Sequence, residues 1–432
     1  MNLVQLTPGA GGMYCGNCFR DNALVAELRR QGHHALMVPL YLPMTVDEAD
    51  QTVGTPIFYG GVSVYLEQKS TLLRRAPRWL HQLLATPTLL KWAGRRAANT
   101  RAINLGELTL SMLRGEEGNQ ARELDELLAW LKTQPPPDVI CLSNAMLLGL
   151  ARKLKQQFRV PVVCYLQGED GFIDAMGEHS QAVWQLMSER AREVDLFIAP
   201  SRYFGDLMAQ RLSIPDSKLR VIHNGINLDG FTANPLLPDP PTLGFFARQC
   251  PAKGLDTLVD AFLLLKKTSR IPFLRLKIGG GYGTGDAPFV SAIRKRLESR
   301  GHAGDVSFHP NIDRNSKIEF LQSLSALSVP ARFGEPFGFY IIEAMAAGVP
   351  VVQPKCASFP ELIATTGGGI CYEPATPESL AASLEALLSK PAQAKAMGLA
   401  GRESVCRLFS IETMAKNFVS TLQEIIPKNA NP

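Results

Sequence analysis

The segment GEPFGFYIIEAMAAGVP, residues 334–350, places one carboxylate before an apolar helix and a second carboxylate inside it. Glu343 is the only charged residue between positions 338 and 347, so we expect its side chain to be partly buried beside a hydrogen-bond donor. Gly348 and Pro350 are typical of a helix end, which makes the predicted helix about ten residues long. The amino end of this helix, beside Glu335 and Gly338, is suited to bind phosphate or sugar oxygens.

The two glutamates also allow a purely structural interpretation. Glu335 can be a charge favoured by the helix dipole, and Glu343 can pair with a lysine or arginine from another element. A second cluster, FFARQCPAKGLDTLVDAFLLL at residues 245–265, favours a ligand instead. It predicts a strand at 243–247, a turn, and a helix that begins near Gly254.

Lys253 stands at the start of that second helix, where a cation opposes the helix dipole by about 0.3–1 kcal/mol. An anion bound between Arg248, Lys253 and the helix amides explains this placement, and a diphosphate is the simplest candidate. Two cations beside a diphosphate stabilise charge on the departing oxygen, as a divalent metal does in other enzymes.

The segments FARQCPAKG (246–254) and EPFGFYIIEAMAAGVPVV (335–352) resemble the retaining glycosyltransferases of family 4. Further matching pieces follow in the same order along the chain: GAGG (9–12), LRRQGH (28–33), SRYFGDLMAQRL (201–212), VIHNGINLDGF (221–231), LKIGGG (276–281) and FPELI (359–363). The resemblance covers most of the chain outside an insertion at about 46–130. It implies the GT-B architecture, an α/β fold with two Rossmann-like, doubly wound parallel-sheet domains facing a central cleft.

The resemblance also implies roles for individual residues. Glu335 and the backbone amides that follow it would contact the transferred sugar, Glu343 would bind the nucleotide ribose, and Arg248 and Lys253 would hold the diphosphate. The implied catalytic residues are therefore Arg248, Lys253 and Glu335. The implied donor-binding set adds Glu343 and the loop and helix-start positions Gly11, Gly12, Phe337, Gly338 and Phe339.

Alternating strands and helices independently predict parallel sheets covered on both faces. We expect strands at 3–7, 35–39, 138–142, 160–166, 196–200 and 219–222, and a second series starting near residues 243, 273, 306, 326 and 349. The segment NPLLPDPPT at 234–242 holds four prolines and reads as a linker. The predicted domains are thus 1–234, 235–408, and a final segment 409–432 whose helix, at about 411–426, crosses back to the first domain in the resembling family.

Length and composition limit the function classes. A chain of 432 residues with 46% apolar content suggests two or three domains with ample cores. The net charge of +5 is too mild to indicate nucleic-acid binding. The first residues lack the pattern of a signal peptide, and no apolar run is long enough to span a membrane, so we expect a cytoplasmic protein with eight reduced cysteines.

The loop GAGGMYCGNCFRDNALVAEL, residues 9–28, follows the first predicted strand. Its glycines permit a tight turn with exposed amides. It is not a nicotinamide-binding fingerprint, because its third glycine is misplaced and the second strand ends without an acidic residue. Cys15 and Cys18 either pack this turn as reduced thiols or contact substrate. We expect no metal site, since the other cysteines and histidines lack the spacing of zinc ligands.

One position departs from the family pattern. After the strand VPVVCYL (160–166), many members carry a histidine near the reacting sugar, whereas this chain has Gln167. Glutamine cannot take a proton at neutral pH. A retaining transfer in which the departing phosphate accepts the proton needs no such base, so activity is still expected. Glu169 and Asp170 either bind acceptor hydroxyls or cap the following helix.

The insertion is strongly basic. Between Glu67 and Glu107 there are eight lysines and arginines and no acid, interleaved with leucines and tryptophans. Residues 69–101 could lie on an anionic membrane at the inner face, pack on their own domain with a solvated basic face, or receive a polymeric acceptor.

We therefore expect a retaining, metal-independent transferase that moves a hexose from a nucleoside diphosphate sugar to the hydroxyl of a glycan, a glycolipid or a small molecule. It needs no cofactor beyond this co-substrate. The alternatives are a glycoside hydrolase that uses Glu335 and Glu343, which would have no use for Arg248 and Lys253, and a non-catalytic carbohydrate-binding protein. The residues leave the nucleobase, the sugar and the acceptor open.

Overall fold

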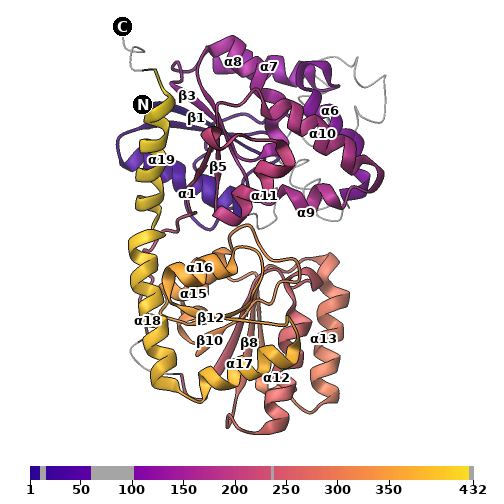
Figure 1. Cartoon of the computed structure of the whole chain (residues 1–432), viewed down its shortest axis with the longest axis vertical. Coiled ribbons are helices and arrows are strands. Elements are labelled where there is room, and N and C mark those ends of the chain that lie inside the picture. Colours follow the sequence, from indigo (N-terminus) through magenta and orange to yellow (C-terminus); the bar gives the residue numbers. More distant parts are fainter. Residues whose placement is uncertain (10–15, 60–101, 235–237, 428–432) are drawn as a thin grey trace. The chain divides into compact units, whose positions relative to one another are not determined.

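The chain forms two compact units in the computed structural model, which describes residues 1–9, 16–59, 102–234 and 238–427 (Figure 1). The first unit comprises Met1–His223 and Met414–Pro432, and the second comprises Asn224–Thr413. Each unit contains a six-stranded sheet whose neighbouring strands are parallel, which confirms the predicted α/β fold.

The sheet of the first unit has the strand order β2-β1-β3-β4-β5-β6. Its strands are β1 (Asn2–Thr7), β2 (His34–Pro39), β3 (Val139–Leu142), β4 (Val162–Tyr165), β5 (Leu196–Ala199) and β6 (Leu219–Val221). Every residue of β3, β4 and β5 is buried. Such continuous apolar strands are expected where helices cover both faces of a parallel sheet.

The helices of the first unit pack around this sheet. They are α1 (Gly16–Arg30), α6 (Gly106–Arg114), α7 (Ala121–Leu131), α8 (Ala151–Phe158), α9 (Glu169–Asp174), α10 (Ser180–Ala191), α11 (Arg202–Leu212) and the 414–425 part of α19 (Ile411–Ile425). The ring of Tyr165 in β4 stacks on that of Phe418 in α19, with centroids 5.6 Å apart. The final helix therefore completes the core of the first unit.

Only part of the predicted insertion is described. Residues 60–101, which include the basic segment 69–101, lie outside the described residues. Helices α6 and α7 fall within the predicted insertion, yet their leucines, including Leu110, Leu113, Leu124 and Leu127, belong to the main apolar core of the first unit. These two helices are therefore part of the domain itself.

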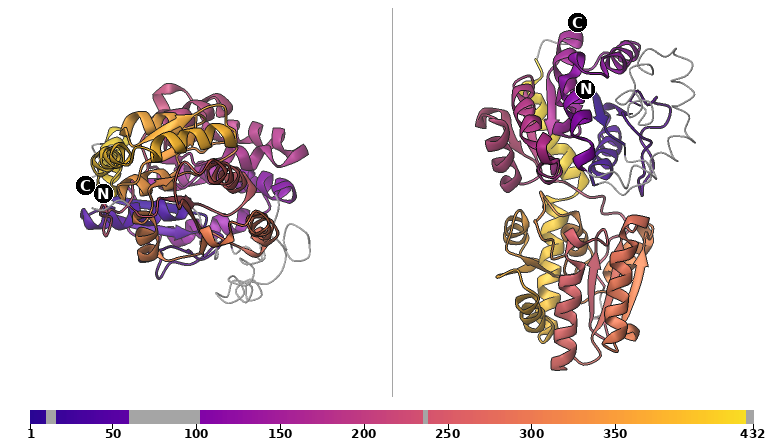
Figure 2. Two further views of the ribbon diagram at one scale, coloured as in Figure 1. Left: turned by 90° about the horizontal axis from the view of Figure 1, so that it is seen from below. Right: turned by 90° about the vertical axis from the view of Figure 1, so that its right-hand side faces the viewer.

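The second sheet has the order β12-β11-β10-β7-β8-β9. Its strands are β7 (Thr242–Phe246), β8 (Arg275–Gly280), β9 (Val306–Pro310), β10 (Ala326–Leu327), β11 (Val351–Pro354) and β12 (Gly369–Tyr372). The helices are α12 (Leu255–Thr268), α13 (Ala287–Ser299), α14 (Arg314–Gln322), α15 (Phe339–Ala346), α16 (Phe359–Thr366), α17 (Pro377–Leu388) and α18 (Pro391–Leu408), and the right-hand view of Figure 2 shows helices on both sides of the strands.

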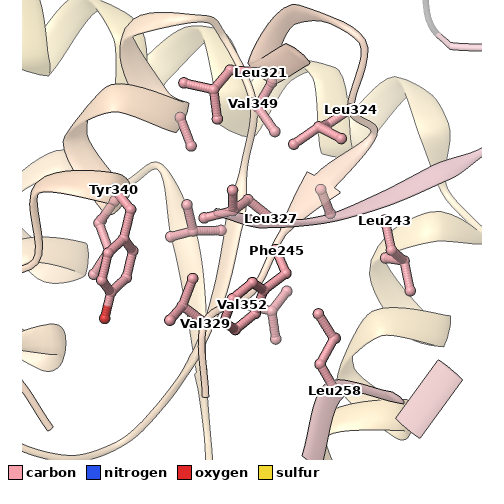
Figure 3. Close-up of a cluster of buried hydrophobic side chains, with 14 of the residues drawn as sticks. Leu243, Phe245, Leu258, Leu321, Leu324, Leu327, Val329, Tyr340, Val349 and Val352 are labelled. Atoms are coloured by element: carbon pink, nitrogen blue, oxygen red, sulfur yellow. The ribbon is translucent and has the colours of Figure 1, made fainter. Parts of the chain in front are cut away.

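Apolar side chains from strands and helices form the core of the second unit (Figure 3). Phe245 of β7, Leu327 of β10 and Val352 of β11 are each fully buried. Leu258 of α12 and Tyr340 of α15 belong to the same core. Burying one such aliphatic or aromatic side chain stabilises the fold by about 1.5–3 kcal/mol, so this core fixes the strands whose ends carry the candidate site.

The proline-rich segment lies inside the second unit and not between the two units. The chain joins the second unit at Asn224, because Ile226 pairs with Ser410 and its amide donates to the carbonyl of Phe409 at 2.9 Å. The strand expected near residue 273 begins at Arg275, since Phe273 has a left-handed φ of 55° and is 81% exposed. Among the described helices, none has both the length and the apolar character needed to cross a membrane.

Candidate functional site

Lys253 and Glu335, 82 positions apart in the sequence, form an ion pair in the second unit. Lys253 ends a short 3₁₀ turn, Pro251–Lys253, between β7 and α12, and Glu335 lies in the loop before α15. The side chains are 29% and 15% exposed. The lysine predicted to bind the diphosphate and the glutamate predicted to bind the sugar therefore lie side by side beyond the carboxyl ends of the central strands β7 and β10.

Neighbouring strands bring these two residues together. Strand β10 pairs with β7, so the loops that follow their carboxyl ends are adjacent. Gly254 has a φ of 71°, and a Cβ there would lie 1.9 Å from the carbonyl oxygen of Pro330. Only glycine permits this close approach. The amide of Arg332 donates to the carbonyl of Ala252 at 3.0 Å, which joins the two loops.

The loop around Glu335 is also fixed from the other side. The hydroxyl of Ser358 donates to the carbonyls of Glu335, at 2.8 Å, and Phe337, at 2.9 Å. The hydroxyl of Tyr340 donates to Oε1 of Glu335 at 3.5 Å. Burial raises the pKa of Tyr340 well above its usual value, and the charge of Glu335 raises it further, so this phenol stays a proton donor.

Arg248 follows β7 and pairs with Asp286, a residue that sequence reasoning missed. Its Nε lies 3.2 Å from each carboxylate oxygen of Asp286, and its Nη2 lies 3.1 Å from Oδ1. The arginine side chain is 56% exposed and the aspartate side chain only 6%. An aspartate next to a helix start, after the glycine-rich run GGGYGTGD (279–286), was the available sequence signal.

Glu343 pairs with Lys317 of α14, and Nζ lies 2.8 Å from Oε1. Both side chains are largely buried. The expected lysine from another element is therefore present, and ribose binding by Glu343 stays a prediction. No sequence pattern singled out Lys317, because its position depends on how α14 packs against α15.

Phe337 of the predicted donor segment belongs to the core, and the half-buried Phe339 packs against that core. The ring of Phe337 is almost fully buried and contacts those of Phe339 and Phe409, with centroids 5.6 and 6.0 Å away. Gly338 between them has a φ of 96°, in the left-handed region that favours glycine. Any contact of Phe337 with a sugar would therefore use its backbone.

Glu169 in the first unit accepts hydrogen bonds from the backbone, which favours the structural alternative, and its contact with an acceptor stays a prediction. Its side chain is buried and accepts hydrogen bonds from the amides of Ala145 and Gln167, each at 2.8 Å. Burial raises the pKa of its carboxyl. Both carboxylate oxygens thus hold backbone, as the capping alternative expected, although the amide of Ala145 starts a different helical segment (Ala145–Leu150).

The structure describes some of the other acceptor-side candidates and not the rest. Gln167 and Asp170 are half-buried, and within the described ranges Nε2 of Gln167 is buried and makes no hydrogen bond. Cys18 is fully buried in α1, as a packing cysteine would be. Gly11, Gly12 and Cys15 lie outside the described residues. In the part of the chain that the structure describes, no three histidine, cysteine or carboxylate side chains are arranged to hold a metal ion.

Two family models match the two halves of the chain. The model described as "Glycosyltransferase Family 4" matches residues 59–229, and "Glycosyl transferases group 1" matches residues 231–404. The chain belongs to the family 4 glycosyltransferases. The Lys253–Glu335 pair, Arg248 and Glu343 all lie within the region that the second model matches.

Curated relatives support this assignment over part of their lengths. Glycogen synthase of Mycobacterium tuberculosis (strain ATCC 25618 / H37Rv) is 26% identical over 286 residues, which is 65% of this transferase and 67% of the relative. D-inositol 3-phosphate glycosyltransferase of Jonesia denitrificans is 30% identical over 40% of this chain and 43% of its own. A mannosyltransferase of Mycobacterium tuberculosis, GDP-mannose-dependent by name, is 27% identical over 48% of this chain and 57% of its own. The matches to the last two thus span about half of each relative.

Solved structures share the fold of this transferase. Sucrose-phosphate synthase from Thermosynechococcus elongatus superposes with a TM-score of 0.72 at 19% identity and covers 98% of each chain. Anabaena HepE in complex with UDP-glucose superposes with a TM-score of 0.66 at 18% identity, over 98% of this chain and 100% of its own. The transferase therefore has the GT-B fold.

Proposed function

We propose that this transferase moves a hexose from a nucleoside diphosphate sugar to an acceptor hydroxyl, with retention of the anomeric configuration and without a metal ion. The observation that carries the proposal is the Lys253–Glu335 ion pair, which joins the turn expected to hold the diphosphate to the loop expected to hold the sugar. Arg248, in the same loop between β7 and α12 as Lys253, supplies the second cation.

The proposed reaction assigns each side chain a task. The bond between the anomeric carbon and the diphosphate breaks, and negative charge develops on the departing oxygen. Arg248 and Lys253 stabilise that charge. The acceptor hydroxyl forms the new bond on the same face of the sugar and gives its proton to the departing phosphate, so Gln167 need not act as a base.

The comparisons narrow the donors to be tried first. HepE was solved with UDP-glucose, and the mycobacterial mannosyltransferase is GDP-mannose-dependent by name. That mannosyltransferase acts on a phosphatidylinositol monomannoside, which makes a lipid-linked acceptor one candidate beside a glycan.

Thermal unfolding with UDP, GDP and ADP tests the proposal directly. We expect one nucleoside diphosphate to raise the melting temperature in the presence of EDTA, because a ligand at a hundred times its Kd stabilises the native state by about 2.7 kcal/mol. UDP-glucose or GDP-mannose should then release the matching diphosphate on turnover. Stabilisation by none of the three, or a strict need for manganese or magnesium, would contradict it, and cleavage of a simple glycoside would favour the hydrolase.

The basic segment 69–101 is proposed to bring the enzyme to an anionic membrane that carries the acceptor. Each cation near such a surface contributes about 1 kcal/mol, and this contribution falls with salt. Replacing Arg74, Arg75 and Arg78 with glutamate should abolish sedimentation with phosphatidylserine vesicles and leave nucleotide binding unchanged. If the wild-type protein does not sediment with these vesicles at low salt, the proposed membrane role is wrong.

A further inference from the structure

Asp286 holds Arg248 from a buried position. Its side chain is 6% exposed, whereas the guanidinium that it contacts is 56% exposed. Oδ2 of Asp286 also accepts a hydrogen bond from the amide of Gly283 at 3.0 Å. A buried carboxylate with one partner in the backbone and another in a solvent-exposed arginine is anchored at its own end and directs the arginine.

The loop that carries Asp286 is itself tied to the strand end that carries Arg248. The amide of Gln249 donates to the carbonyl of Gly281 at 2.8 Å. A Cβ on Gly280 would lie 2.3 Å from the carbonyl oxygen of Ala247, so that residue must be glycine for the two segments to approach so closely. Asp286 and Arg248 are thus fixed relative to each other through their backbones as well as their side chains.

The geometry of the Arg248–Asp286 pair leaves one edge of the guanidinium available to a ligand. Nε and Nη2 point toward Asp286, which leaves Nη1 directed elsewhere. A planar guanidinium held on one edge is pre-organised for an anion on the other. We propose that Asp286 is a positioning residue for the transfer reaction, which orients Arg248 toward the donor diphosphate. This inference rests on the proposed function of Arg248.

The charges of the site give the inference a distinctive signature. Three cations, Arg248, Lys253 and Lys317, pair one to one with three carboxylates, Asp286, Glu335 and Glu343. Asp286 adds a negative charge close to a bound diphosphate, which disfavours binding by Coulomb repulsion. Removing that charge should therefore not weaken diphosphate binding, while the loss of orientation should slow turnover.

Asp286→Asn tests this signature, because asparagine keeps an acceptor for the amide of Gly283 and loses the charge that holds Arg248. We expect kcat with UDP-glucose or GDP-mannose, whichever the wild type turns over, to fall about tenfold. Thermal stabilisation by inorganic pyrophosphate should be unchanged or stronger. Asp305→Asn, which removes a carboxylate paired with Lys266 at 2.9 Å before β9, is the matched control and should leave both readouts unchanged.

A double-mutant cycle separates positioning from a structural role. Arg248→Ala should lower kcat about a hundredfold, and adding Asp286→Asn to it should cost nothing more. Wild-type turnover in Asp286→Asn, or the full tenfold loss on the Arg248→Ala background, would overturn the inference. If Arg248→Ala itself turns over normally, the proposed diphosphate site fails first, which distinguishes the two failures.

Arg248→Lys provides an independent test if Asp286→Asn does not fold. It leaves Asp286 in place, but a lysine cannot reproduce the guanidinium edge that contacts the carboxylate. We expect turnover close to that of Arg248→Ala. Near-normal turnover would show that charge alone is sufficient and that orientation by Asp286 is not required.

Discussion

Glu335 in the second unit and Glu169 in the first unit are both partly or fully buried, and each follows a strand. They differ in the groups that donate hydrogen bonds to their carboxylates. Glu335 is paired with Lys253, whose side chain remains 29% exposed. Glu169 is held by two backbone amides and is only 4% exposed. A lysine can exchange one anion for another, whereas a backbone amide inside a loop cannot move without unfolding that loop. The partner therefore indicates whether a buried carboxylate serves chemistry or architecture.

The largest expected effect concerns Lys253, the partner of Glu335. Lys253→Ala should leave a folded protein that has lost about a hundredfold in turnover, because one charge that stabilises the departing diphosphate is missing. Arg270→Ala removes an exposed cation paired with Glu385 and should change little. Release of nucleoside diphosphate from the donor measures both. Equal rates in the two variants would contradict the assignment of Lys253.

The architectural side predicts a loss of stability. Glu169→Ala leaves the amides of Ala145 and Gln167 without their acceptor, and we expect the free energy of unfolding to fall by about 2 kcal/mol. Urea unfolding measures this change. Asp170→Ala, at the half-buried next position, is the control and should lose less. A stable Glu169→Ala variant with impaired transfer would return Glu169 to the acceptor candidates.

A smaller effect should separate the two carboxylates of the donor site. If Glu343 binds ribose hydroxyls, Glu343→Gln should weaken binding of the free nucleoside diphosphate about tenfold. Glu335→Gln should lower turnover and leave that binding nearly intact. Calorimetric titration with UDP, GDP and ADP and a rate assay give the two quantities. Equal losses of nucleotide affinity would favour a structural role for both residues.

The smallest expected effect is a pH dependence. Burial raises the pKa of the Glu169 carboxyl above its ordinary value of 4.5, so the folded state binds this proton more tightly than the unfolded state. Between 4.5 and the raised pKa, the unfolded chain releases the proton first, and this group lowers stability as pH rises. The unfolding free energy of wild type minus that of Glu169→Gln should therefore become smaller as pH rises above 4.5. A constant difference would show that Glu169 does not titrate there.

The alternating strands and helices could be predicted from the sequence better than the side-chain pairs of the candidate site. All six strands of the first sheet follow from short apolar runs, and the helix expected at 411–426 is observed at Ile411–Ile425. The four-residue strand β12 escaped prediction because it directly follows two glycines and begins with a third, which leaves an apolar run of only three residues. Arg248, Lys253 and Glu335 were identifiable from their own positions, whereas Asp286 and Lys317 depend on distances between loops and helices that no local pattern encodes.

Helix α19 has a consequence for how this protein is made. Its residues Met414, Ala415, Phe418 and Leu422 are fully or almost fully buried, and Phe418 stacks on Tyr165. Residues 1–223 leave the ribosome long before this helix is translated, while the second unit is a continuous stretch. Until α19 is translated, the first unit therefore exposes the apolar surface that this helix later covers on one side of its sheet. A chaperone that shields this surface would raise the yield of folded enzyme.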